Sequence, residues 1–337
     1  MDSRCQQLHA WLSATLQHAE FTLSVASADA SFRRYFRVHL ADRSLIAMDA
    51  PPQHENCAPF VQIAKLFGDA GVHVPQVLAQ DLSQGFLLLS DLGDVTYLSQ
   101  LNAASAPRLY HDASMALIKL QLASQSNVLP DYDAATLTRE MQLFPDWYVS
   151  RHLGVSLDEK QQAILHKTFE VLNQNILAQG RVYVHRDYHS RNLMACDDNP
   201  GVLDFQDAVY GAIAYDLVSL LKDAYISWEE EQIIDWVVRY WQAARKAGLP
   251  VPDDFSDFYR DFEYMGAQRH IKVLGIFARL YYRDGKAGYL KDMPRVLQYL
   301  RNVCERYVEL RPMLRLLDSL SGQDLHPDAN YKNLLKL

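Results

Sequence analysis

The sequence predicts a bilobal α+β fold in which a small β-rich lobe precedes a large helical lobe. Short segments with strand-like composition are concentrated before Leu92. Longer segments with helical periodicity follow, and strand-like segments return only between Arg181 and Phe205. The glycine in Leu92-Gly93-Asp94 marks the expected boundary, so we assign residues 1–92 to the first lobe and residues 93–337 to the second.

The first lobe is expected to contain a helix, three strands, a second helix and two more strands. A stripe at helical spacing, which includes Leu8, Leu12 and Leu16, indicates the first helix. Ala41-Asp42-Arg43 provides a hairpin turn, and Pro51-Pro52 ends the third strand. The expected strands cover residues 22–26, 34–40, 44–50, 76–81 and 86–90, and the second helix covers residues 58–70.

The second lobe is expected to be helical apart from three short strands. The expected helices cover residues 107–125, 134–152, 158–179, 212–226, 229–247, 256–284 and 294–318. The expected strands cover residues 181–185, 193–196 and 201–205, and the polar residues 197–201 form the turn between the last two.

Composition excludes several classes of protein. Hydrophobic residues make up 49% and charged residues 22% of the 337 positions, which is typical of a folded globular chain. The net charge of −8 argues against nucleic-acid or anionic-membrane partners, although a local basic pocket for phosphate stays possible. The four scattered cysteines indicate reduced thiols, and we see no signal peptide and no membrane span, so we expect a cytoplasmic protein.

Residues 185–192, His-Arg-Asp-Tyr-His-Ser-Arg-Asn, carry the most informative chemistry in the chain. Asp187 is a candidate base, and Asn192 and Asp204 are candidate Mg²⁺ ligands, at the spacing of a kinase catalytic loop and metal loop. A hairpin of strands 193–196 and 201–205 would bring Asn192 and Asp204 to the same end, where oxygen ligands can converge on Mg²⁺. The alternative for Asp187 alone is an ordinary surface carboxylate. Asp216 follows closely and, if buried, can accept backbone N–H bonds from the loop and stiffen it.

The segments HRDYHSRNLM and VLDFQDAVYGAIAYDL resemble the aminoglycoside phosphotransferase/choline kinase superfamily. The chain is especially similar to the bacterial anomeric sugar kinases of cell-wall recycling. Three segments carry that narrower resemblance: residues 29–37 (DASFRRYFR), 48–52 (MDAPP) and 89–93 (LSDLG). The resemblance implies a protein-kinase-like fold, with ATP and Mg²⁺ as cofactors. It further implies a reaction that phosphorylates the anomeric hydroxyl of N-acetylmuramate and N-acetylglucosamine.

The resemblance also implies roles for individual residues. Asp187 would orient or deprotonate the sugar hydroxyl, while Asn192 and Asp204 would hold Mg²⁺ against the nucleotide. His189 would brace the loop, and Arg191 would either brace it or face the transferring phosphate. Asp207 would assist at the metal. The backbone of the hinge, which includes Leu89, Asp91 and Leu92, would bind the purine edge.

The phosphate-binding part of the first lobe departs from the usual kinase plan. The first hairpin carries Ser31, Phe32, Arg33 and Arg34 with no glycine between residues 27 and 34. Met48 occupies the position at which the superfamily places a phosphate-binding lysine, and the helix at 58–70 lacks the glutamate that would pair with it. The backbone, the Ser31 hydroxyl and one of the two arginines are therefore candidates for phosphate contact. The alternative for the arginines is a solvated pair beside an edge strand.

The acceptor is expected on the helical lobe. Arg269 and Lys272 lie three positions apart in a long helix and share a face, which would suit a carboxylate such as the lactyl group of muramate. The alternative for each is a solvated helix face. Acidic residues such as Asp223 are also present, so the mixed charge favours a neutral or anionic sugar over a polycationic aminoglycoside. The candidate substrate contacts are Arg191, Asp207, Asp223, Arg269 and Lys272.

Three functions remain open from the sequence. The first is a sugar kinase, which we expect to be a monomer, with a small-molecule sugar as its partner. The second is an aminoglycoside or choline/amino-alcohol phosphotransferase. The third is a nucleotide-gated scaffold that lacks activity, which the missing lysine motivates. A protein kinase is not expected, because Asp204-Phe205-Gln206 runs almost directly into a helix and leaves no room for a long activation segment.

Overall fold

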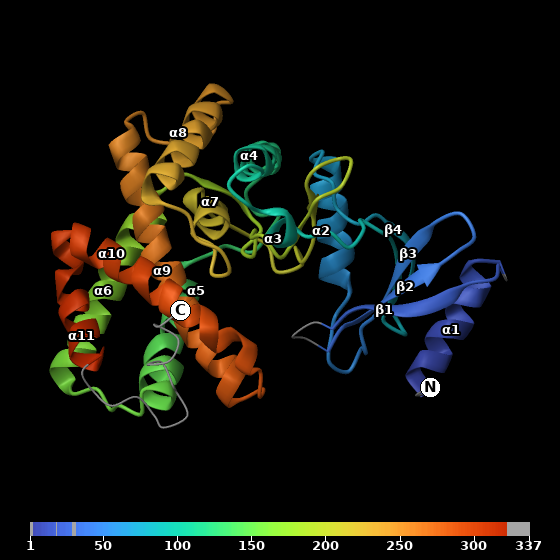
Figure 1. Cartoon of the computed structure of the whole chain (residues 1–337), viewed down its shortest axis with the longest axis horizontal. Coiled ribbons are helices and arrows are strands. Elements are labelled where there is room, and N and C mark those ends of the chain that lie inside the picture. Colours follow the sequence, from blue (N-terminus) through green and yellow to red (C-terminus); the bar gives the residue numbers. More distant parts are fainter. Residues whose placement is uncertain (1–2, 18, 29–31, 322–337) are drawn as a thin grey trace. The chain divides into compact units, whose positions relative to one another are not determined.

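The computed structural model describes residues 3–17, 19–28 and 32–321, and it confirms the α+β prediction. The chain forms two compact units (Figure 1). The first unit comprises the residues up to Leu120 together with Arg191–Ala208, and the second comprises Gln121–Ser190 and the residues from Val209 onward. The predicted boundary between residues 92 and 93 stays a prediction.

The first unit is built on a five-stranded antiparallel sheet with the strand order β1-β2-β3-β5-β4. Its strands are β1 (Thr22–Ala28), β2 (Arg34–His39), β3 (Ser44–Asp49), β4 (Val77–Asp81) and β5 (Phe86–Ser90). Its helices are α1 (Ser3–Thr15), α2 (Ala58–Asp69), α3 (Tyr97–Gln100) and most of α4 (Ala106–Leu122), and the short hairpin is β7 (Leu193–Met194) with β8 (Gly201–Val202). All five strands predicted for this region are present.

The two faces of this sheet have different neighbours. Leu8 and Leu12 of α1 pack on Leu45 and Ala47 of β3 within one buried apolar cluster. Since successive side chains of a strand point to opposite faces, Ile46 lies on the other face, where it lines a cavity described below. The helix α1 therefore supplies the core of one face and leaves the other face for a binding site.

The second unit is mainly helical (Figure 1) and also contains a small two-stranded sheet. Its helices are α5 (Ala134–Met141), the π-helix η1 (Phe144–His152), α6 (Glu159–Ala178), α7 (Ala214–Leu221), α8 (Glu230–Lys246), α9 (Phe255–Tyr282), η2 (Ala287–Asp292), α10 (Met293–Arg306), η3 (Val308–Leu310) and α11 (Arg311–Ser321). Its strands β6 (Arg181–Val184) and β9 (Val209–Ala212) pair antiparallel.

The centre of this unit is α9, in which every residue from Phe262 to Gly275 is buried. Contacts with α5, η1, α6, α7, α8 and α10 surround it. A Cβ at Gly275 would collide with the backbone of Leu143, so glycine permits the close approach of α9 to the start of η1. The alternative that Arg269 and Lys272 lie on a solvated helix face is therefore wrong.

Three element predictions need correction. The helix expected over 134–152 is divided into α5 and η1, because Pro145 lacks an N–H and cannot continue the regular helical hydrogen bonding. The helix expected over 212–226 is shorter, since Val209–Ala212 pairs with β6 and delays the helix to Ala214. The last helix, expected over 294–318, is interrupted between α10 and α11 by the single turn η3.

Candidate active site

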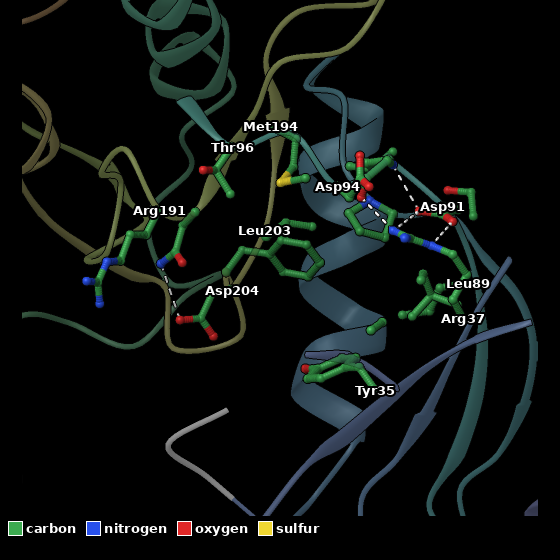
Figure 2. A pocket seen from close by; sticks show the side chains of 18 of the residues that line it. Tyr35, Arg37, Leu89, Asp91, Asp94, Thr96, Arg191, Met194, Leu203 and Asp204 are labelled. Carbon is green, nitrogen blue, oxygen red and sulfur yellow. Dashed lines mark hydrogen bonds and ion pairs between the residues drawn. The ribbon is translucent and has the colours of Figure 1, made fainter. Parts of the chain in front are cut away.

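A cavity of about 320 Å³ lies within the first unit, between the sheet, α2 and the β7–β8 hairpin (Figure 2). Apolar side chains from all three line it: Ile46, Phe60, Leu89, Leu92, Met194, Leu203 and Phe205. Polar groups stand at its edges, with Arg191 and Asp204 on one side and Arg37 and Asp91 on the other. A concave apolar site with a few convergent polar groups is the usual form of a small-molecule pocket.

The Asp91 carboxylate fixes the segment that leaves β5. Arg37 Nε donates to Asp91 Oδ2 at 2.7 Å, and the Ser44 hydroxyl donates to the same oxygen at 2.7 Å. The backbone N–H of Gly93 donates to Asp91 Oδ1 at 2.9 Å. Burial alone would raise the pKa of Asp91, but these donors outweigh it and hold the pKa below its ordinary value. The predicted hinge thus forms one wall of the cavity, and its carboxylate is committed to shaping that wall.

Asn192 and Asp204 come together at one end of the β7–β8 hairpin, as the sequence predicts. The backbone N–H of Leu203 donates to the carbonyl of Asn192 at 2.9 Å. Asn192 Nδ2 lies 3.3 Å from Asp204 Oδ2, and Gln206 Nε2 donates to Asp204 Oδ1 at 2.8 Å. Asp204 has a φ of 63°, a left-handed conformation that is uncommon outside glycine. Such an outlier is expected where surrounding structure holds a functional residue in place.

This pair fits a magnesium site. Mg²⁺ prefers oxygen ligands and is usually held by one or two protein groups together with substrate phosphates and water. One amide and one carboxylate supply that set here. Within the described residues there is no group of three or more His, Cys, Asp or Glu side chains that could hold a metal by itself. The metal role of Asn192 and Asp204 stays a prediction.

Phe205 anchors the segment that carries Asp204. Its ring is buried and lies 4.8 Å from the ring of Phe60 and 5.8 Å from that of Phe67, measured between centroids. Both partners belong to α2, so this helix supports the candidate metal segment through aromatic packing.

The predicted phosphate contacts near the first hairpin have other partners in the structure. Ser31 lies outside the described residues. The backbone N–H of Phe32 donates to Glu55 Oε1 at 3.2 Å, and Arg33 Nε lies 3.8 Å from Glu55 Oε2. Arg34 forms an ion pair with Asp49 at 2.5 Å. The two arginines therefore each face a carboxylate, and their predicted role at the nucleotide phosphates stays a prediction.

Met48 and Asp49 are both buried at the end of β3. Met48 is fully buried and, among the described residues, does not belong to the cavity lining, although it was predicted to contact the nucleotide. The next residue, Asp49, is also fully buried and pairs with Arg4 of α1 at 2.8 Å as well as with Arg34. The ion pairs of this sheet are therefore formed at Asp49, one position after Met48, and their cations are arginines.

The catalytic loop of the second unit begins where β6 ends and is fastened to α7. The backbone N–H groups of His185 and Arg186 donate to the two oxygens of Asp216, at 2.6 and 3.0 Å. Arg186 has a φ of 78°, a second left-handed residue in the candidate site. The backbone N–H of Asp187 is 3.2 Å from His185 Nδ1, and that of His189 donates to the carbonyl of Asp187 at 3.0 Å. Asp216 therefore has the supporting contacts that the sequence suggested.

Asp187 and Asp216 have opposite pKa shifts. Burial alone would raise the pKa of Asp187, but the charges of Lys272, His189 and Arg269 outweigh it and hold the pKa below its ordinary value. Burial raises the pKa of Asp216 to about 7, despite its two backbone donors. Asp187 is therefore kept ionised, which suits a base, whereas Asp216 supports the backbone of the loop.

The cations near Asp187 are themselves held inside the unit. Lys272 Nζ lies 3.2 Å from Glu140 Oε1 and donates to the Tyr215 hydroxyl at 3.0 Å. Glu140 also pairs with Arg186 and accepts from the Tyr132 hydroxyl. Arg269 Nε donates to the Ser219 hydroxyl at 3.0 Å. Glu140 thus links the loop residue Arg186 to Lys272 of α9.

The structure does not gather the predicted acceptor residues on one open surface. Arg269 and Lys272 are 6% and 7% exposed, and Asp223 is 1% exposed. Arg191 and Asp207 are exposed and belong to the first unit. The substrate roles of these five residues stay predictions. The three buried residues among them have clear internal partners.

Sequence reasoning missed Arg37, Ser44 and Glu140. Arg37 and Ser44 lie on neighbouring strands, and their alternation with apolar residues resembled ordinary exposed positions. Glu140 lies 132 positions before Lys272 and was part of an unremarkable helical pattern. A charged residue flanked by buried positions was the signal available, but its partner could not be identified without the fold.

Comparisons with known proteins identify the family of this chain. Residues 22–255 match the model of the phosphotransferase enzyme family. The chain is 50% identical over 323 residues to the N-acetylmuramate/N-acetylglucosamine kinase of Neisseria meningitidis serogroup B, covering 94% of this chain and 96% of the relative. It is also 50% identical over 329 residues to the Pseudomonas aeruginosa protein of the same name, covering 95% and 97%.

Solved structures confirm the predicted protein-kinase-like fold. A choline kinase from Streptococcus pneumoniae matches with a TM-score of 0.62 at 11% identity, covering 89% of this chain and 100% of that chain. An ADP-bound aminoglycoside phosphotransferase matches with a TM-score of 0.56 at 15% identity, covering 89% and 98%. None of the helices in the described part of the chain combines the length and apolar character needed to cross a membrane. The chain belongs to the phosphotransferase enzyme family and is an enzyme of phosphoryl transfer.

Proposed function

We propose that this enzyme transfers the γ-phosphoryl group of ATP to the anomeric hydroxyl of N-acetylmuramate and N-acetylglucosamine, in peptidoglycan recycling. The observation that carries the proposal is the 50% identity, over nearly the whole chain, to two kinases named for these sugars. The more distant likeness to a choline kinase concerns the fold and gives no reason to prefer choline as the acceptor.

The first unit supplies the nucleotide site in this proposal. The apolar walls around Leu89 and Leu92 suit a purine, and the Arg37–Asp91 pair keeps the hinge in one shape. Asn192 and Asp204 would hold Mg²⁺, which, when bound, offsets the charge of the nucleotide phosphates. We expect ATP as the donor, because the family resemblance makes it the ordinary choice.

The second unit supplies the base. Asp187 takes the proton of the sugar C1 hydroxyl, the hydroxyl oxygen forms a bond to the γ-phosphorus, and the bond from that phosphorus to the bridging oxygen breaks to release ADP. The low pKa of Asp187 keeps it ready to accept this proton at neutral pH. Since the anomeric hydroxyl is more acidic than an ordinary alcohol, modest assistance by the base is sufficient.

An acceptor panel tests the proposal. Purified protein with ATP and Mg²⁺ is incubated with N-acetylmuramate, N-acetylglucosamine, choline or an aminoglycoside, and the products are examined by ³¹P NMR. We expect a phosphate coupled to the C1 proton with both sugars. The 1-O-methyl glycoside of N-acetylglucosamine is the matched control, because it lacks the free C1 hydroxyl and should give no product.

Several outcomes would contradict the proposal. Phosphorylation of the methyl glycoside would move the reaction to another hydroxyl, and turnover of choline or the aminoglycoside alone would change the substrate class. Absence of turnover with every acceptor would favour the scaffold interpretation. We further propose a monomer located in the cytoplasm, which sedimentation and cell fractionation can check.

A further inference from the structure

The segment that follows α7 contacts the second half of the catalytic loop. Asp223 Oδ2 accepts from the backbone N–H of Ser190 at 3.0 Å. The ring of Tyr225 meets the ring of His189 edge-on, with centroids 5.4 Å apart and an interplanar angle of 80°. Two adjacent loop residues are therefore held by two residues of the segment 223–225, through independent contacts.

These contacts are separate from those of Asp216 and act at the opposite end of the loop. Asp216 binds the N–H groups of His185 and Arg186, whereas Asp223 binds that of Ser190. Asp216 lies within α7, whereas Asp223 follows the end of that helix at Leu221. Asp187 lies between the two attachment points.

The segment 223–225 is itself held in place by further contacts. Asp223 Oδ1 accepts from the backbone N–H of Tyr225 at 2.9 Å, which closes a tight turn after α7. Arg295 Nη1 donates to the carbonyl of Ala224 at 2.7 Å, and the Tyr225 ring packs on Phe277 of α9 with centroids 6.2 Å apart. The segment is therefore tied to α9 and α10 as well as to the loop.

The hydrogen bond to Ser190 lies in the interior. Ser190 is fully buried and Asp223 is 1% exposed. A buried N–H without an acceptor is costly, and a bond to a carboxylate is stronger than one between neutral groups. Both oxygens of Asp223 accept from backbone amides, one from the loop residue Ser190 and one from Tyr225 in its own turn.

We propose that Asp223 is a positioning residue that, together with Asp216, clamps the catalytic loop at its two ends and so fixes the backbone that carries Asp187. This inference rests on the proposed function, since it takes Asp187 as the catalytic carboxylate. It replaces the substrate contact that the sequence suggested for Asp223.

Steady-state kinetics of full-length variants test the clamp. We expect Asp223→Ala to lower kcat for the sugar by about 10- to 100-fold, since small displacements of a catalytic group have effects of this size. Asp223→Asn keeps one acceptor oxygen and should lose less. The KM for ATP should stay within about twofold, because the lost contact is a backbone hydrogen bond of the catalytic loop and not part of the nucleotide pocket. Asp235→Asn, on an exposed pair with Arg239, is the matched control and should leave kcat unchanged.

Amide hydrogen exchange tests the clamp independently of the proposed reaction. The Ser190 amide should exchange faster in both Asp223 variants, while amides of β6 keep their protection. If the alanine variant does not fold, the asparagine variant decides. An unchanged Ser190 exchange rate overturns the clamp whatever the activity, and a raised KM for the sugar with normal kcat returns Asp223 to a substrate contact. If the wild-type protein phosphorylates no sugar, the proposed function fails, but the exchange measurement still tests the clamp.

Discussion

The two units of this enzyme hold their buried charges in different ways. In the first unit, the fully buried Asp49 pairs with Arg4 and Arg34, whose side chains are 22% and 36% exposed. In the second unit, Glu140 pairs with Lys272, whose side chain is 8% exposed, and with Arg186, whose side chain is 22% exposed. Both cations of Asp49 therefore reach water, whereas one of the two cations of Glu140 does not.

This difference indicates where each unit is sensitive to substitution. A cation that loses its partner at the surface can be hydrated, so the loss is partly offset. A cation that loses its partner in the interior stays desolvated and uncompensated, which is the costly case. The nucleotide unit should therefore tolerate changes in its ion pairs better than the unit that carries the catalytic loop.

The largest effect is expected for the catalytic carboxylate itself. Asp187→Asn removes the proposed base and should lower kcat by about 10²-fold, the lower end of the usual contribution of a positioned acid or base, because the anomeric hydroxyl is itself relatively acidic. The KM for ATP should change little, since the nucleotide cavity belongs to the first unit. Coupled detection of ADP at saturating sugar measures both values, and full turnover in the variant would remove Asp187 from the reaction.

The next effect is one of stability and tests the comparison directly. Glu140→Gln leaves Lys272 and Arg186 without their carboxylate and should lower the free energy of unfolding by about 3–5 kcal/mol. Asp49→Asn should cost less, because Arg4 and Arg34 can turn toward water. Urea denaturation of both variants gives the two values, and an equal or larger loss for Asp49→Asn would contradict the proposed difference.

A smaller effect is expected at the hinge. Arg37→Ala removes three hydrogen bonds to Asp91 and Gly93 and should raise the KM for ATP by about 10-fold. The value of kcat at saturating ATP should stay close to normal, because the catalytic loop belongs to the other unit. A matched control is Arg43→Ala, an exposed position on the turn between β2 and β3. A fall in kcat with unchanged KM would show that the hinge does not set nucleotide affinity.

The sequence predicted the first unit better than the second for a physical reason. Strand alternation, turn residues and the pair of Asn192 with Asp204 all depend on neighbours within a few residues or one hairpin, so local patterns were sufficient. The polar centre of α9 was misinterpreted because its partners, Glu140 and Tyr215, are distant in the chain. Hydrophobic periodicity identifies apolar cores and has no means of recognising a buried charge that is paired across the fold.

Sequence patterns do not identify a charged partner that is distant in the chain, and this also explains the interpretations of Arg34 and Asp223. A basic residue near a phosphate-binding strand and an acidic residue near an acceptor site both look functional in a sequence. In the structure Arg34 pairs with the buried Asp49, and Asp223 accepts from backbone amides, while their predicted ligand roles stay predictions. Residue type alone does not distinguish a ligand contact from an internal ion pair.

A pH profile sharpens the role of the buried cation. Among the positive charges around Asp187, Lys272 lowers its pKa the most. Lys272→Met should therefore raise that pKa. Because the ionised form is the base, the acid limb of kcat should move to higher pH, and activity should be lost earlier on acidification. Lys65→Met, on an exposed side chain of α2, should leave the profile unchanged. An acid limb at the same pH in both variants would exclude Lys272 from the electrostatics of Asp187.

The smallest effect is expected for exposed ion pairs, at which the two units should respond alike to substitution. Lys65 pairs with Asp69 in the first unit and Arg239 pairs with Asp235 in the second, and all four side chains are at least half exposed. Exposed pairs gain little because water screens them and two flexible side chains must be ordered. Alanine at Lys65 or at Arg239 should therefore give no resolvable change in melting temperature. If only the Arg239 variant were destabilised, the sensitivity to substitution would come from the helical unit itself and not from burial of the charge.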